Sequence, residues 1–381
     1  MTKYNSEKRI AWIDFVKFLG VLFVLLSHME LEIPLISEYG YSFYVPIFFV
    51  LAGFVYQRKE ESFLDFMKRK AKRLLIPYFG YSFFLYIFFF LKDYLLPGKV
   101  SIQALQPLLG IFYGRNCLYP MDASSNFFFL TILNSPMWFL LALFAASVLF
   151  EICIRISGSS WRKMLSNNIL ILAMGICIMY MAPILLPWSL DTVFLFEVFM
   201  SAGYVMKNTM IAVDQSQKQK AEREEDSGGS EEREQEQNTK RARKQKIRHI
   251  ITIVILTVTA ILLRAFNGPM NVSVGDFGNS IAIGVVVGIL SSESMILLCY
   301  LLRDHIPVGA AFIGRSSLTI MCLHMFIYMF IKTGINILLP DLLSQDTFLS
   351  VFVKAMAVSA TLAILTIYDL WRQGRGNLHG K

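Results

Sequence analysis

The stretch IAWIDFVKFLGVLFVLLSHM, residues 10–29, decides the fold class of this chain. It is long enough to cross a bilayer as one helix, which needs about 20 residues, yet it carries Asp14, Lys17 and His28. An ionisable side chain at membrane depth costs about 2.5 to 3.5 kcal/mol on insertion scales, so its presence indicates a function. Lys17 and His28 lie about 20° apart around such a helix and about 16 Å apart along it. One stripe of the helix therefore carries a cation near one end and an imidazole near the other.

The rest of the chain is equally apolar. Hydrophobic residues make up 55% of it and aromatic residues 14%, which is typical of a protein that crosses a membrane several times. Ten apolar segments are expected to span the bilayer, at about 10–29, 42–57, 75–96, 136–154, 168–187, 191–207, 248–266, 278–301, 309–332 and 347–370.

The positions of the basic residues orient these segments. With the N-terminus inside, Lys and Arg gather in the inner connections such as 57–75, whereas the outer connection 30–41 has none, as the positive-inside rule requires. We therefore predict an all-α integral membrane protein with about ten transmembrane helices and both termini in the cytoplasm. The net charge of +8 belongs to these inner connections, so no nucleic-acid partner is expected.

Two long connections divide the chain. Residues 208–248 are rich in both acidic and basic side chains, and such a segment cannot bury enough apolar surface to fold. We expect a disordered, charged cytoplasmic linker there, between an N-terminal membrane half (1–207, about six helices) and a C-terminal half (249–381, about four helices and a short tail). The other long connection, 98–135, is apolar and aromatic and is expected to cover the bundle on the outside.

Several motifs, in this order, carry a family resemblance. After the Asp14–Lys17–His28 pattern come FYVPIFFVLAGFVY (43–56), KRKAKRLLIPY (68–78), GIFYGRN (110–116), PMWFLLALF (136–144) and IGRSSLTIMCLH (313–324). Together they resemble the membrane acyltransferase-3 family, in the branch similar to fucose 4-O-acetylase. The match covers nearly the whole chain apart from the linker.

The resemblance implies transfer of an acyl group, usually acetyl, from cytosolic acyl-CoA to a hydroxyl of a cell-envelope carbohydrate or lipid-linked glycan. It implies a multi-pass protein of the plasma membrane, in contact with membrane lipid. Much of the wider family has Arg where this chain has Lys17. Lysine lacks the two-pronged guanidinium of arginine, so an arginine's role does not carry over directly.

His28 is the first candidate for the chemistry. An imidazole titrates near neutral pH and can take the proton of an attacking alcohol, or it can itself carry the acyl group between two steps. The sequence leaves both roles open. His324 lies at a comparable depth in its own segment and is expected either to share these duties or to bond a neighbouring helix. Asp14 and Lys17 are i,i+3 neighbours that can pair, either to pin the helix or to place positive potential along the passage for acyl-CoA.

The remaining candidates would bind the two substrates. The phosphates of acyl-CoA need cations at the cytoplasmic mouth, and Arg69, Arg73 and Arg315 lie in matched motifs there, although such cations also anchor helices to lipid. Arg115 and Trp138 are the candidates for binding the sugar, unless Trp138 only packs beside the site. No motif has metal-ligand spacing, so acyl-CoA is the only co-substrate expected and no metal is expected.

Two other classes of protein compete with this interpretation. A polysaccharide exporter would also have many spans with buried charges, but it has no need of a lysine and a histidine on one stripe. A membrane scaffold that recruits partners through 208–248 would lose its function when that segment is deleted and would tolerate His28→Ala.

Overall fold

The computed structural model describes residues 11–28, 40, 42–98, 101–115, 117–119, 136–158, 160–225, 231–344 and 347–378. All regular structure in these residues is helical, apart from isolated bridge residues such as the pair Asn271 and Asp276. The predicted all-α class is therefore confirmed for the described part of the chain.

Twelve α-helices are described along the chain. They are α1 (Ala11–His28), α3 (Pro46–Phe54), α4 (Phe63–Phe90), α5 (Gln106–Tyr113), α6 (Trp138–Ser157), α7 (Trp161–Met181), α8 (Val193–Glu225), α9 (Glu231–Asn267), α10 (Ile281–Leu301), α11 (Val308–Arg315), α12 (Ser317–Leu338) and α13 (Phe348–Leu378).

Eight of the described helices are long and apolar enough to cross a membrane. They occupy 11–28, 63–95, 138–157, 162–181, 243–267, 281–301, 317–338 and 348–373. Two of the ten expected segments take other forms. The second contains α3, a helix of nine residues that begins at Pro46 after a turn at Tyr44 and Val45, and the sixth is the first part of the much longer α8.

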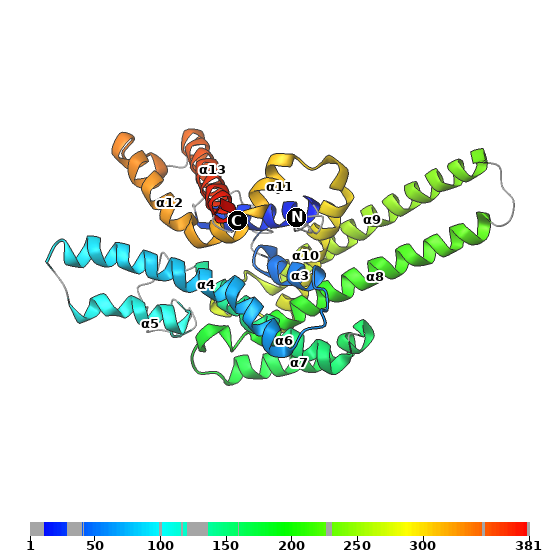
Figure 1. Cartoon of the computed structure of the whole chain (residues 1–381), viewed down its shortest axis with the longest axis horizontal. Coiled ribbons are helices and arrows are strands. Elements are labelled where there is room, and N and C mark those ends of the chain that lie inside the picture. The colour runs from blue at the N-terminus through cyan, green and yellow to red at the C-terminus, as the bar shows by residue number, and fades with distance from the viewer. Residues whose placement is uncertain are drawn as a thin grey trace.

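The short α3 is possible because protein surrounds it. Seven of its residues are buried, and the helix lies in the centre of the bundle near α8 and α10 (Figure 1). A break in a helix at membrane depth is tolerated where the freed backbone groups face protein rather than lipid. Gly53 lets α3 approach α8 closely, since a Cβ at Gly53 would lie 1.8 Å from the carbonyl oxygen of Met200.

The predicted disordered linker is instead largely helical. Residues 208–225 continue α8, and residues 231–248 form the first part of α9. The two far ends project together from the body of the molecule (Figure 1). Glu, Gln, Lys, Arg and Ala dominate this stretch and are strong helix formers. Because both helices continue from membrane helices, they also avoid the unfavourable nucleation step.

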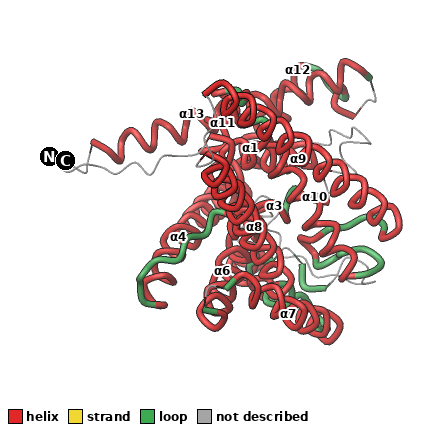
Figure 2. Tube along the Cα trace, turned by 90° about the vertical axis from the view of Figure 1, so that its right-hand side faces the viewer, coloured by secondary structure: helices red, strands yellow, loops and turns green. Residues whose placement is uncertain are grey.

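The arrangement around α8 positions the functional residues. Figure 2 shows α8 in the middle of the bundle, with α1, α11 and α13 on one side and α6 and α7 on the other. Helix α1 contacts α10, α11 and α12. The contact with α11 is a close one, because a Cβ at Gly314 would lie 1.8 Å from the carbonyl oxygen of Asp14.

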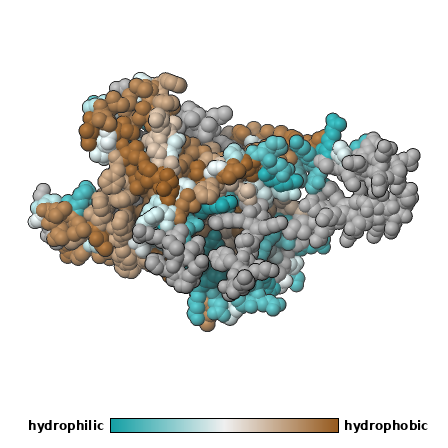
Figure 3. All heavy atoms as spheres, turned by 45° about the horizontal axis from the view of Figure 1, so that its top comes forward, coloured by the Kyte–Doolittle hydropathy of each residue, from teal (hydrophilic) through white to brown (hydrophobic). Residues whose placement is uncertain are grey.

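Large parts of the molecular surface are apolar. Figure 3 shows hydrophobic residues gathered on the side of the molecule that holds α12 and α13. Large apolar side chains are also exposed along α4, α7 and α9. A soluble monomer rarely exposes contiguous apolar surface on this scale, so these faces fit a bilayer.

Candidate active site

Two histidines from distant segments meet at one end of α1. His28 is the last residue of α1, and its ring centroid lies 5.4 Å from that of His324 on α12, with the ring planes inclined by 36°. His28 is half-buried, whereas His324 is completely enclosed. The structure thus brings together the two imidazoles that the sequence placed at a common depth, and we call them the histidine pair.

The hydrogen bonds of His324 define its tautomer. Its Nδ1 lies 3.0 Å from the carbonyl oxygen of Ile320 and 3.2 Å from that of Met321. A carbonyl only accepts, so Nδ1 carries the proton and the neutral ring keeps its lone pair at Nε2. Nε2 is buried and has no hydrogen-bond partner among the described residues. A hydroxyl placed beside it can therefore donate a hydrogen bond or a proton there.

A cationic cluster lies at the other end of α1. The ammonium of Lys17 donates to Asp14 Oδ1 at 2.8 Å, as its i,i+3 spacing predicted, and Nε of Arg315 on α11 lies 3.5 Å from Asp14 Oδ2. The Asp14 side chain is 1% exposed, whereas those of Lys17 and Arg315 are 25% and 39% exposed. A buried carboxylate thus positions two cations, both of which keep an accessible face.

A further polar network beside this cluster was not predicted. Asp369 of α13 is buried and accepts from Thr319 Oγ1 of α12 at 2.7 Å and from Arg372 at 2.7 Å. Arg372 also donates to the hydroxyl of Tyr81 on α4 at 3.0 Å. Asp369 and Arg372 have the same i,i+3 spacing in an apolar segment as Asp14 and Lys17, and that signal would have found them.

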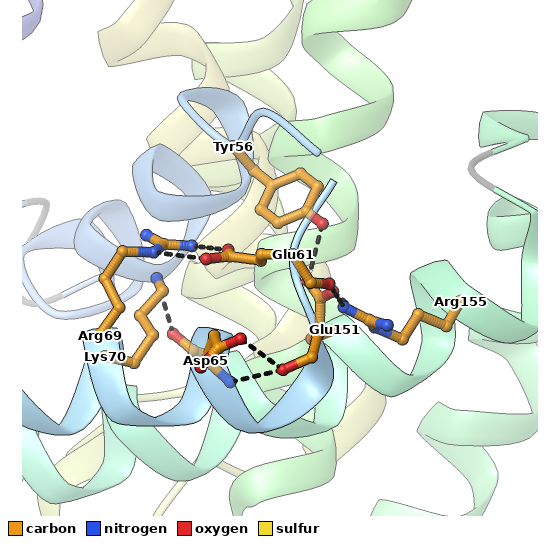
Figure 4. A network of polar contacts seen from close by, with 9 residues as sticks. Tyr56, Glu61, Asp65, Arg69, Lys70, Glu151 and Arg155 are labelled. Atoms are coloured by element: carbon orange, nitrogen blue, oxygen red, sulfur yellow. Dashed lines mark hydrogen bonds and ion pairs between the residues drawn. The ribbon is translucent and has the colours of Figure 1, made fainter. Parts of the chain in front are cut away.

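Arg69 belongs to a separate network between α4 and α6. It donates to Glu61 in the loop before α4 and lies over the ring of Phe66. Figure 4 shows the surrounding contacts, in which Glu151 of α6 accepts from Tyr56 at 2.7 Å and from Arg155 at 2.8 Å. These bonds fasten the loop 55–62 to the end of α6, so we call this network the loop clasp.

Two groups of the loop clasp have shifted pKa values. The hydrogen bond from Arg69 lowers the pKa of the Glu61 carboxyl below its ordinary value. Burial, followed by the hydrogen bond to Glu151, raises the pKa of the Tyr56 hydroxyl. Both shifts favour the observed pattern, in which Glu61 and Glu151 accept and Tyr56 donates. The geometry of Arg69 is that of a structural residue.

The other basic candidate on α4 differs from Arg69. Arg73 is exposed and lies one turn further along α4. It has no hydrogen bond or ion pair among the described residues, so its guanidinium is available to a ligand or a lipid headgroup.

Neither candidate for binding the sugar offers an open surface. Arg115 is 3% exposed and bonded on all sides: it donates to both oxygens of Asp191 at 2.5 and 2.7 Å and to the Ser273 carbonyl at 2.8 Å. Trp138 is 7% exposed and packs on Phe196 of α8, with ring centroids 6.0 Å apart. Arg115 therefore ties its own segment to those of Asp191 and Ser273, and Trp138 belongs to the aromatic core.

A pocket of about 460 Å³ lies elsewhere, between α8, α9 and α10. Its lining includes Glu293, Leu297 and Tyr300, and none of the site residues predicted from the sequence. Among the described residues, no three His, Cys, Asp or Glu side chains lie close enough together to hold a metal ion.

The fold and the paired imidazoles define a class: an all-α, multi-pass membrane protein with a proton-accepting group at the end of a spanning helix. Comparison with protein families makes this specific. Residues 10–368 match the family described as the acyltransferase domain of type 3, so the chain belongs to the acyltransferase-3 family and is an acyltransferase that transfers groups other than aminoacyl groups. Comparisons with curated proteins and with solved structures gave no match.

Proposed function

We propose that this acyltransferase moves an acyl group, most simply acetyl, from cytosolic acyl-CoA to a hydroxyl of a cell-envelope carbohydrate. The observation that carries the proposal is the histidine pair at one end of α1 with the Asp14–Lys17–Arg315 cluster at the other. Cations with accessible faces suit the phosphates of the donor, and an imidazole with a free lone pair suits proton transfer from an alcohol.

The reaction is an exchange of one ester for another. The hydroxyl oxygen of the sugar attacks the thioester carbonyl carbon, and the C–S bond breaks as the new C–O bond forms. His28 takes the hydroxyl proton and returns it to the CoA thiolate, giving a thiol. In the two-step alternative, a nitrogen of His28 attacks the thioester carbonyl first, and the CoA thiolate leaves and takes the N–H proton of the ring as a thiol. The sugar hydroxyl then attacks the acyl-imidazole, takes the acyl group and gives its proton back to His28. In both, His324 Nε2 accepts a hydrogen bond from a second hydroxyl of the sugar, and this bond orients the attacking hydroxyl toward His28.

The placement in the cell follows from the same features. The apolar exterior and the basic inner connections support a protein of the plasma membrane, with the cationic cluster facing the cytoplasm. The histidine pair is then on the outer side of the bilayer, where envelope glycans or lipid-linked sugars are accessible. The fucose 4-O-acetylase-like motifs support acetyl as the acyl group.

The decisive experiment uses purified protein in liposomes with radiolabelled acetyl-CoA on the Lys/Arg-rich side and a panel of envelope glycans. His28→Ala is expected to lower label transfer by about 100-fold or more, the typical contribution of a general base. His324→Asn is the sharper variant, because the amide nitrogen of Asn can still donate to the Ile320 carbonyl while the acceptor at Nε2 is lost. We expect it to fold and to lose at least about 10-fold in rate.

His305→Asn is the matched control, since His305 is an exposed histidine just after α10. Omitting the acceptor separates the two roles of His28: label that stays on wild-type protein and is absent from His28→Ala indicates an acyl-imidazole. Unchanged transfer in His28→Ala would remove His28 from the mechanism. Glycan movement across the bilayer without any turnover of acetyl-CoA would favour the exporter.

A further inference from the structure

Arg372 has the geometry of a binding residue rather than of a simple membrane anchor. Three side chains from three helices hold one edge of its guanidinium: Tyr81 of α4, Thr319 of α12 and Asp369 of α13. A basic residue that only contacts lipid headgroups needs no such support, because a long flexible side chain finds the interface by itself.

The buried carboxylate of Asp369 also indicates that Arg372 is held in place as a binding residue. Its side chain is 3% exposed, and it accepts hydrogen bonds from Thr319, Arg372 and Gln373. An isolated buried carboxylate is costly, and an apolar residue would pack there without that cost. The acid therefore serves to position the guanidinium, just as Asp14 positions Arg315.

The unused edge of Arg372 is open to a ligand. Its side chain is 45% exposed. The guanidinium has five N–H donors, and the three bonds above leave Nε–H and one Nη1 hydrogen without a hydrogen-bond partner among the described residues. Each of these two N–H groups can donate a charge-assisted hydrogen bond to a phosphate oxygen.

Arg315 and Arg372 lie at the same end of the bundle. Thr319, which bonds Arg372, follows Arg315 by four residues across the turn at Ser316 between α11 and α12, and α11 contacts both α1 and α13. Together with Lys17, this site has three cations for two buried carboxylates. The surplus positive charge and the free donor edges point to a ligand with more than one phosphate.

We infer that Arg372, held by Asp369, Thr319 and Tyr81, binds a phosphate of the acyl donor opposite Arg315 at the mouth of the site. This inference rests on the proposed function for the identity of the donor. The shared chemistry is phosphate recognition, which a lipid headgroup can also supply, so the test has to separate these two sources.

The test measures binding of adenosine 3′,5′-bisphosphate to the full-length protein in neutral detergent, where no anionic lipid competes. Arg372→Gln is expected to weaken binding by about 10-fold or more, the loss typical of a hydrogen bond between charged groups. Arg372→Lys keeps the charge but lacks the guanidinium donors that both hold the group and face the ligand, and it should give an intermediate loss. Asp369→Asn should weaken binding less than Arg372→Gln, since the guanidinium remains but is less firmly held.

Arg303→Gln is the matched control, because Arg303 is also 45% exposed but rests on the ring of Tyr300, away from this network. It should bind the bisphosphate as wild type does. In turnover assays, Arg372→Gln should raise KM for acetyl-CoA and leave the reaction with acetyl-pantetheine, which has no phosphate, unchanged.

Three results would overturn the inference. These are equal bisphosphate affinity in wild type and Arg372→Gln, an equal loss of activity with acetyl-pantetheine, and an effect seen only with phosphatidylglycerol vesicles. Bisphosphate binding that depends on Arg372, in a protein that never turns over acetyl-CoA, would instead uphold the phosphate site and refute the proposed reaction.

Discussion

At the scale of single residues, the ionisable side chains in apolar segments divide into two kinds. Some are fully enclosed by protein partners, as Arg115 is by Asp191, Leu186 and Ser273. Others are tethered along one edge and accessible along the other, as Arg315 and Arg372 are. Of these arginines, only the second kind has donors left for a ligand, and exposure rather than charge separates the two.

Loss of Arg115 is expected to destabilise the fold without touching the histidine pair. Arg115→Met leaves the Asp191 carboxylate buried and uncompensated, which typically costs about 3–5 kcal/mol. Thermal unfolding in detergent should therefore show a clear drop in Tm. The double variant Arg115→Met with Asp191→Leu should recover part of the lost Tm, because no lone charge remains.

Arg303→Gln is the control for this prediction. Arg303 forms an exposed pair with Asp304 at 4.0 Å, so its loss should change the free energy of unfolding by less than about 1 kcal/mol. Equal Tm values for Arg115→Met and wild type would contradict this role.

The loop clasp should weaken in acid. The pKa of Glu61 is lowered in the folded protein by its hydrogen bond from Arg69, whereas in the unfolded chain it is about 4.3. A lowered pKa means that the bond stabilises the fold above about pH 4.3, and that this stability is lost as the pH falls through the folded-state value. Tm measured against pH should therefore fall less steeply below about pH 4.3 in Glu61→Gln than in wild type. Parallel curves would show that the clasp adds no measurable stability.

At the scale of elements, the sequence predicted most of the helices and some of their contacts. Long apolar segments and their flanking charges were sufficient to predict the eight described helices that are long and apolar enough to cross a membrane. The i,i+3 pairing of Asp14 with Lys17 was also predictable, because both partners lie on one helix. The bonds of Arg115 to Asp191 and of Thr319 to Asp369 join distant segments, and periodicity within a segment holds no information about them.

The helical form of residues 208–225 and 231–248 shows where composition misleads. Low hydrophobicity correctly excludes a packed core, but it does not exclude helix when the residues are strong helix formers. The irregular α3 was equally hard to foresee. Its turn at Tyr44 and Val45 depends on the enclosure provided by neighbouring helices.

The crossing of α1 and α11 depends on Gly314. A methyl group there would lie 1.8 Å from the carbonyl oxygen of Asp14, so Gly314→Ala must push α11 away, at a cost of about 1–3 kcal/mol for overpacking. We also expect a rise in KM for acetyl-CoA, because Arg315 would move with α11. Gly309→Ala on the same helix is the control: no atom lies within 4 Å of its Cβ position, and alanine is the better helix former. Similar stability of both variants would show that the crossing is loose.

At the scale of the whole molecule, the proposed function places the two reaction partners on opposite sides of the bilayer, with α1 between them. The charged ends of α8 and α9 project from the body that holds α1 and α12 (Figure 1). The chemistry proposed here takes place within that body.

Deleting residues 215–240 and joining the ends with a short Gly/Ser linker should therefore leave acyl transfer within about twofold of wild type. The membrane parts of α8 and α9 keep their contacts, and a flexible linker spans the gap without strain. The measurement is label transfer in liposomes at matched folded yield. Loss of transfer in this variant, with normal transfer in His28→Ala, is the result that a scaffold predicts.

The separation between Lys17 and His28, about 16 Å along α1, has a consequence for the choice of donor. A donor whose phosphates rest on the cationic cluster delivers its thioester to the imidazoles only if the arm joining them is long enough. The length of α1 between the two sites then sets the distance that the arm of the donor has to span. It selects donors by reach as well as by charge, so a phosphorylated thioester with too short an arm occupies the mouth and blocks the entrance without reacting.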